Sequence, residues 1–268
     1  MANAITIRKE TRQGKEIRLV QQGDLFHGMV AGKPVTAGPS ADTVWEQTIA
    51  DIGKHDPRYF GLDGAIRRFR KFFPEGFSDP SYEERERNYK LKARNTLIRN
   101  APLQDVLEAR GDAEELLRAY RELNLLAPQE KTVLQNFLRS ADGLRFGPAI
   151  ARFAIEADAA ALRNLEAVLR PHGADKWTIV TYLPYLWIPG KHIFLKPEVT
   201  KDFAARIGHP LAHDYEARLN IQTYDSLLDL ARQTFLGIAE LAPRDMLDVQ
   251  SFIWTVGAYQ EKDLPASS

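Results

Sequence analysis

The segment Gly61-Leu-Asp-Gly-Ala-Ile-Arg-Arg-Phe-Arg-Lys-Phe-Phe-Pro74 marks the point where the chain changes from strand-like to helical patterning. Its apolar residues recur at spacings of three and four, which is the period of one helix face. These residues are Ala65, Ile66, Phe69, Phe72 and Phe73. Pro74 and Gly76 then predict the end of this helix. Most segments from here to residue 256 show the same period, so the sequence predicts a mainly α protein.

The first forty residues have a different pattern, with short β-prone runs separated by turn residues. The runs are 5–7, 17–20 and 25–30, and Val35 begins a further strand. Thr43 and Glu46 have the spacing of a capping box and predict a helix that ends near Gly53. We therefore expect a multi-helix body with a small N-terminal antiparallel β-sheet plus helix, α+β overall. The predicted domains are a sheet and helix module at 1–54 and a helical domain at 55–268, with a sub-boundary near 171–175.

Within the helical domain, two segments need a more specific prediction. Ser81 and Glu84 form a second capping-box spacing, which predicts one helix from about Tyr82 to Arg99. The segment 177–195 is open between strand and helix, because 177–183 is rich in β-branched and aromatic residues while Asp175 is a candidate helix cap.

Composition excludes several classes of protein. The 268 residues carry 36 Lys plus Arg and 36 Asp plus Glu, so the net charge is zero and excludes a histone-like polycation. A hydrophobic content of 44% is too high for a disordered chain. The absence of cysteine excludes disulfides, cysteine-ligated metals and thiol catalysis. With no signal-peptide or membrane-spanning pattern, we expect a cytoplasmic protein without membrane contact.

The charge is nevertheless uneven along the chain. Residues 51–99 carry 12 basic against 8 acidic residues, a local excess of four positive charges. We expect basic helices here to contact the phosphates of nucleic acid, as part of a non-enzymatic accessory protein. The candidate nucleic-acid-binding residues are Arg67, Arg68, Lys71, Arg87, Lys90 and Arg94. The alternative is a solvated helix face, because Glu83, Glu84 and Glu86 lie one turn before Arg87 and Lys90.

Two weaker patterns raise the alternative of a metal-dependent phosphodiesterase or nuclease. Asp245 and Asp248 form a carboxylate pair of the kind that binds Mg²⁺, although capping of the last helix accounts for them equally well. His209 and His213 are four residues apart, the spacing of two metal ligands on one helix. Gly208 and Pro210 interrupt a helix there, which argues against a metal site at the two histidines. The sequence therefore predicts no bound metal, and it also predicts no cofactor.

A third alternative is a protein–protein interaction subunit. Tyr185 and Trp187 belong to an aromatic run that starts at Trp177. Exposed aromatic residues of this kind bind partner proteins, whereas burial would assign them to the core. The sequence leaves both interpretations open.

Two short sequence segments in the C-terminal half also resemble a family of proteins. Phe-Leu-Lys-Pro at 194–197 and Asp-Val-Gln-Ser-Phe-Ile-Trp at 248–254 resemble segments of a group of uncharacterised bacterial proteins. The resemblance covers most of residues 55–256 and implies no activity, cofactor or catalytic residue.

Overall fold

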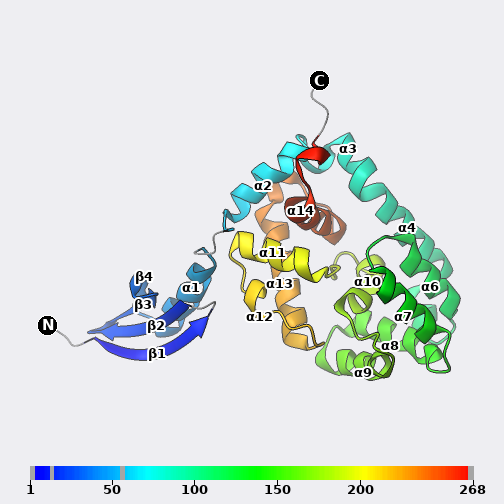
Figure 1. Cartoon of the computed structure of the whole chain (residues 1–268), viewed down its shortest axis with the longest axis horizontal. Coiled ribbons are helices and arrows are strands. Elements are labelled where there is room, and N and C mark those ends of the chain that lie inside the picture. The colour runs from blue at the N-terminus through cyan, green and yellow to red at the C-terminus, as the bar shows by residue number, and fades with distance from the viewer. Residues whose placement is uncertain (1–3, 13–14, 55–57, 265–268) are drawn as a thin grey trace. The chain divides into compact units, whose positions relative to one another are not determined.

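The computed structural model describes residues 4–12, 15–54 and 58–264. It confirms the predicted fold class, because helices dominate the described chain and an antiparallel sheet occupies its N-terminal part (Figure 1). The chain forms two compact units. Unit 1 comprises residues 1–65 and 201–214, and unit 2 comprises 66–200 and 215–268. The boundary predicted at residue 54 and the sub-boundary near 171–175 stay predictions.

Unit 1 contains a four-stranded meander in which each strand pairs antiparallel with the next. Glycines with positive φ, Gly23 at 64° and Gly32 at 78°, allow two of its tight turns. One face of the sheet packs against helix α1 through a core that includes Ile17, Leu19 and Trp45. The strands are β1 (Ile5–Arg12), β2 (Lys15–Gln22), β3 (Leu25–Val30) and β4 (Lys33–Gly38), followed by α1 (Ala41–Lys54).

The start of α1 differs from the predicted capping box. The helix begins at Ala41, and the Ser40 hydroxyl accepts hydrogen bonds from the Thr43 backbone N–H and side chain at 3.4 and 3.0 Å. The serine that precedes the helix therefore takes the capping position that the sequence assigned to Thr43. The packing of α1 also depends on Gly28 in β3, where a Cβ would lie only 1.7 Å from Thr48 Oγ1.

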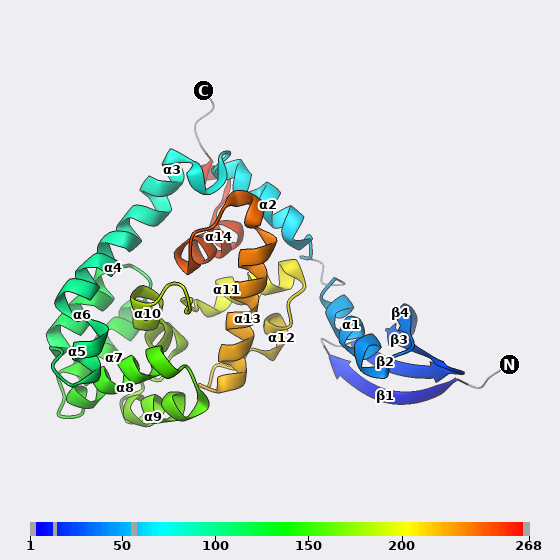
Figure 2. The ribbon, with the colours of Figure 1, turned by 180° about the vertical axis from the view of Figure 1, so that it is seen from behind.

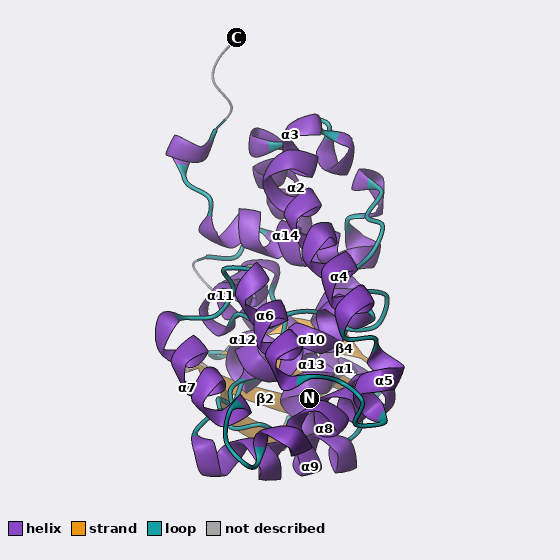
Figure 3. Cartoon of the chain, turned by 90° about the vertical axis from the view of Figure 1, so that its right-hand side faces the viewer, coloured by secondary structure: helices purple, strands orange, loops and turns teal. Residues whose placement is uncertain are grey.

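The described residues of unit 2 form helices and the loops between them, with no strand (Figures 2 and 3). Its helix α10 (Trp177–Trp187) is buried on every side and contacts α4, α6 and α8. The other longer helices of unit 2 are α4 (Asn88–Asn100), α6 (Ala113–Glu122), α7 (Pro128–Leu138), α8 (Gly143–Glu156), α9 (Ala159–Leu169), α13 (Ile221–Gly237) and α14 (Met246–Ala258). Two helices include residues of both units: α2 (Gly61–Phe72) and α11 (Pro197–Ile207). The short helix α12 (Leu211–Asp214) belongs to unit 1.

Helix α10 settles the segment that the sequence left open between strand and helix. The Thr181 hydroxyl donates to the Trp177 carbonyl at 2.7 Å, a bond that a β-branched residue makes along a helix. Two tyrosine hydroxyls join α10 to α6: Tyr120 donates to the Ile179 carbonyl and Tyr182 to the Ala119 carbonyl, both at 2.7 Å. Burial on all faces explains why this sequence lacks helical periodicity.

The helix predicted from 82 to 99 is divided into three parts. A short helix α3 (Pro80–Tyr82) begins after Asp79, whose carboxylate accepts from the Ser81 N–H at 2.9 Å and from its hydroxyl at 2.6 Å. The cap is therefore Asp79, and the predicted Ser81 cap is wrong. One π-helical turn, Glu83–Arg87, follows before α4 starts. A π turn in a longer helix often marks a functional site.

None of the helices in the described part of the chain has the length and apolar character needed to cross a bilayer.

Candidate functional site

The six cations predicted to bind nucleic acid lie in three different environments. Arg67 and Lys71 are exposed on α2, Arg68 and Arg94 are half-buried, and Arg87 and Lys90 are buried. Arg68 donates to the carbonyls of Val256 and Tyr259 at 2.8 and 2.7 Å, so it holds the end of α14. The six residues therefore do not form one phosphate-facing surface.

Arg87 is bound by the two aspartates that the sequence proposed as a metal site. Its guanidinium donates to both carboxylate oxygens of Asp245 at 3.0 and 2.9 Å, and to Asp248 Oδ1 at 2.6 Å. The side chain is 7% exposed, so water screens these ion pairs little. Ion pairs of Arg87 with Asp245 and Asp248 therefore hold the π turn against the start of α14.

Asp248 is completely buried and accepts hydrogen bonds from three further groups. Tyr82 donates through its hydroxyl at 2.5 Å, and Arg244 donates through its backbone N–H at 2.8 Å and through its guanidinium. Burial opposes ionisation, but the hydrogen bonds from Arg244 and Tyr82 outweigh it and hold the pKa of Asp248 below its ordinary value. The carboxylate is an anchor for α14 with its oxygens already in use.

Asp245 caps α14, as one of the two interpretations of the sequence expected. Its Oδ1 accepts from the backbone N–H groups of Leu247 and Asp248 at 2.9 and 3.4 Å. Together with the Arg87 bonds, these contacts occupy both of its oxygens. The Asp245–Asp248 pair thus serves structure, and the geometry gives no support to a divalent cation there.

Lys90 is a second buried cation of the same region, with 1% of its surface exposed. Its ammonium donates to Glu86 Oε2 at 3.0 Å, Gln250 Oε1 at 2.9 Å and Ser251 Oγ at 2.7 Å. Burial lowers the pKa of Lys90, and the Glu86 carboxylate opposes that effect. Three acceptors match the three N–H bonds of an ammonium group, so Lys90 is a charged structural residue and not a free amine.

A pocket of about 350 Å³ lies beside this buried pair in unit 2. Its lining combines opposite charges, amides and aromatic rings. Its lining includes Tyr89, Glu122, Leu125, Lys196, Gln250 and Trp254. A second hollow of about 550 Å³ shares Asn124, Leu125 and Lys196 with the first. Lys196 therefore lies where the two hollows meet.

Lys196 and Gln250 provide the polar groups of this pocket. The Lys196 ammonium lies 4.9 Å from the centre of the Trp254 ring, a cation–π contact. Among the described residues, no carboxylate pairs with it. Gln250 is 5% exposed, and its Oε1 is held by Lys90 and, at 3.5 Å, by the Tyr185 hydroxyl. Its NH₂ group is then the end left for another acceptor.

The aromatic residues proposed as a partner surface are in the core. Tyr185 has no exposed surface and Trp187 is 6% exposed. The Trp187 indole donates to the Ala101 carbonyl at 3.0 Å, which fixes it between helices of unit 2. Neither side chain offers a surface to a second protein, and burial supports the core interpretation.

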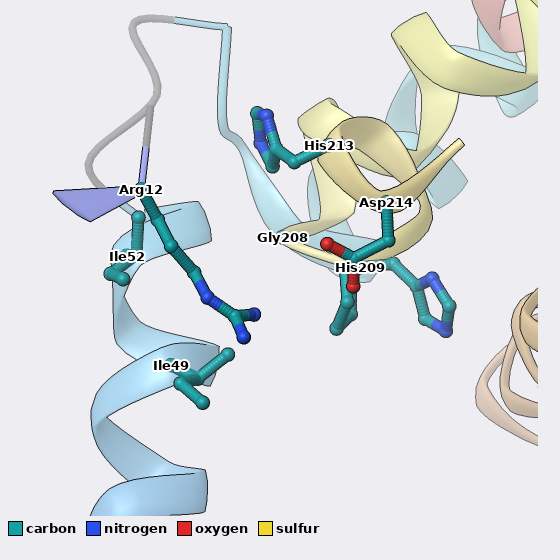
Figure 4. A pocket seen from close by; sticks show the side chains of 8 residues that line it. Arg12, Ile49, Ile52, Gly208, His209, His213 and Asp214 are labelled. Carbon is teal, nitrogen blue, oxygen red and sulfur yellow. The ribbon is translucent and has the colours of Figure 1, made fainter. Parts of the chain in front are cut away.

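The histidine pair lies in unit 1 and does not form a metal site. Gly208, with φ at 79°, ends α11, so His209 and His213 are not on one continuous helix. His209 is 4% exposed and its Nδ1 accepts from the Leu211 N–H at 3.1 Å. Figure 4 shows the two imidazole rings pointing in different directions beside a cavity of about 20 Å³, room for about one water molecule. Across 4–12, 15–54 and 58–264, no three His, Asp or Glu side chains form a metal-binding group.

No family model, curated protein or solved structure matches the chain.

Sequence reasoning missed the residues that define the pocket. Lys196, Gln250 and Trp254 were not proposed as site residues, and Lys90 was assigned to a surface. Two signals were available. Glu86 and Lys90 have i,i+4 spacing and form a buried ion pair of 3.0 Å. The two segments that resemble other proteins, 194–197 and 248–254, contain Lys196, Gln250 and Trp254. Spacing alone does not tell a buried pair from an exposed one.

Proposed function

We propose that unit 2 binds a small molecule through a carboxylate group in the pocket beside Lys196. The observation that carries the proposal is a half-buried lysine that lines a 350 Å³ pocket and has no carboxylate partner among the described residues. The ammonium group of such a lysine gains from a carboxylate counter-ion, because a charge-assisted hydrogen bond is stronger than a neutral one.

Gln250 supports a carboxylate at this place. Lys90 holds its Oε1, so the amide presents NH₂ as a donor, and a ligand carboxylate is a matching acceptor. Lys90 acts here as a positioning residue: all three of its own N–H bonds are used inside the protein. The recognition group is then Lys196 together with the Gln250 amide.

The other walls of the pocket suit an apolar or aromatic part of the same molecule. Trp254 is half-buried, Tyr89 is 40% exposed and Leu125 is half-buried, so each leaves part of an apolar surface uncovered. Stacking and apolar contact at these walls add affinity without a requirement for further polar groups.

Isothermal titration calorimetry with 3-phenylpropionate as the probe tests this proposal. We expect binding of the carboxylate and no binding of 3-phenylpropanamide, its neutral amide. Lys196→Met should weaken binding about tenfold or more, the effect of losing a charge-assisted hydrogen bond. Lys92→Met, an exposed lysine of α4, is the matched control and should bind as the unmodified protein does. Equal binding of acid and amide, or no heat with either, overturns the proposal.

Nucleic-acid contact is retained as a second candidate because Arg67 and Lys71 are exposed one turn apart on α2, with exposed Arg70 between them. A basic helix face of this kind binds phosphates in a salt-dependent way. Titration of mixed DNA and RNA at increasing salt should show affinity that falls with salt and falls further in the Arg67→Ala, Lys71→Ala double variant. Binding that is absent, or insensitive to salt, excludes this candidate.

A further inference from the structure

The pocket beside Lys196 contains a second charged group that a simple carboxylate does not use. Glu122, the last residue of α6, lines the same cavity. It is exposed, and among the described residues no hydrogen bond or ion pair engages its carboxylate. One small cavity therefore holds an acidic and a basic side chain that are each without an opposite charge.

The two groups do not neutralise each other. No ion pair within 4.0 Å joins Lys196 to Glu122, although both are described residues of unit 2. Lys196 instead lies over the ring of Trp254. Unlike charges that share a pocket without contact are complementary to a ligand that carries both signs, because each ligand charge then meets its own partner.

The remaining charges of the lining leave this balance unchanged. Lys90 is paired with buried Glu86, so the two together add no net charge to the pocket wall. The Asn124 side-chain oxygen accepts from Lys131 at 3.2 Å, and Lys131 is not among the residues that line the pocket. The lining as a whole has one positive and one negative group available.

We infer that the ligand of this pocket is a zwitterionic amino acid with a large apolar side chain, whose carboxylate binds Lys196 and Gln250 and whose ammonium group binds Glu122. This inference rests on the proposed function and adds the ammonium group to it. The apolar side chain lies against Trp254, Tyr89 and Leu125. A cavity of about 350 Å³ is at the small end of ligand sites and suits a single amino acid.

Three molecules on one scaffold test the inference by calorimetry. L-phenylalanine carries both charges, 3-phenylpropionate lacks the amine and phenethylamine lacks the carboxylate. We expect L-phenylalanine to bind about fivefold more tightly than 3-phenylpropionate, since Glu122 is exposed and its ion pair is partly screened. Phenethylamine should bind more weakly than either.

The variant Glu122→Gln identifies the group responsible and should leave folding intact, because the side chain is exposed. It should remove the advantage of L-phenylalanine and leave 3-phenylpropionate unchanged or slightly better. Glu84→Gln, an exposed glutamate outside the pocket, is the control and should bind as the unmodified protein. Equal binding of the two acids, unaltered by Glu122→Gln, overturns the zwitterion inference and leaves the carboxylate site standing. No binding of either acid overturns both.

Discussion

Replacing Arg87 by Met tests whether the buried Asp248 carboxylate depends on its guanidinium partner. Arg87 makes a 2.6 Å bond to Asp248 and bonds of 3.0 and 2.9 Å to Asp245. Met keeps much of the side-chain volume and removes the charge. The variant therefore leaves a fully buried carboxylate with Arg244 and Tyr82 as its remaining side-chain donors.

The magnitude follows from the burial of the pair. Breaking a buried ion pair by removing one partner costs about 3–5 kcal/mol. Arg244 still compensates part of the Asp248 charge, but its side chain is 42% exposed, so we expect the lower end, about 3 kcal/mol. With a urea dependence of about 2 kcal/mol per molar, the midpoint should fall by about 1.5 M.

The assay is urea unfolding followed by circular dichroism at neutral pH. Lys71→Met, an exposed cation of α2, should change stability by less than about 0.5 kcal/mol. Adding Asp248→Asn to Arg87→Met should recover stability, because the uncompensated charge is removed with its partner. A midpoint for Arg87→Met equal to that of Lys71→Met, or no recovery in the double variant, would refute the reasoning.

Three further outcomes check other parts of the structure. Burial lowers the pKa of His192 from 6.5 to about 4, so the folded protein favours the neutral imidazole. The stability that this difference contributes, about 3 kcal/mol, is complete above pH 6.5 and is lost as the pH falls towards 4. Unfolding measured at a series of pH values should show this loss of stability, and the His192→Phe variant should not show it. Gly28→Ala should destabilise unit 1 by about 1–3 kcal/mol through the clash with Thr48, while Gly190→Ala, with open space around it, should be nearly neutral in thermal melts. Asp158→Ala removes the cap of α9, whose carboxylate accepts from the Ala161 N–H at 2.8 Å, and should cost about 1 kcal/mol by denaturant titration; an unchanged midpoint would show that the cap contributes nothing.

Local patterns in the sequence were sufficient for most of the fold. The short β-prone runs and the glycine turns between them predicted an antiparallel sheet, because Gly23 and Gly32 adopt the positive φ that two of its turns require. The three-and-four spacing of Phe69, Phe72 and Phe73 predicted α2. Helix α10 was not resolved in advance, since a segment buried on all sides has no polar face from which to read a period.

The π turn and the pocket were beyond local reasoning for a different physical reason. Arg87 and Lys90 were grouped with exposed cations because their spacing is that of one helix face. Their partners Asp248 and Gln250 lie some 160 positions away along the chain, at separations of 161 and 160. A local sequence pattern does not show which residues so far apart in the chain will pair. The capping role of Asp245 depends only on its immediate neighbours, and the sequence offered it as one of two interpretations.

The division of unit 1 between two stretches of chain has a consequence for the order of its synthesis. Residues 1–65 leave the ribosome first, but 201–214, which belong to the same unit, are made 136 positions after residue 65 (201 minus 65). At about 5–20 residues per second, translation separates the two stretches by about 7–27 seconds. In the folded protein the sheet and α1 share a core of their own, which residues 201–214 do not supply. The nascent sheet module therefore has to persist while most of unit 2 is still being made, and a rare-codon pause between residues 65 and 201 would lengthen its wait.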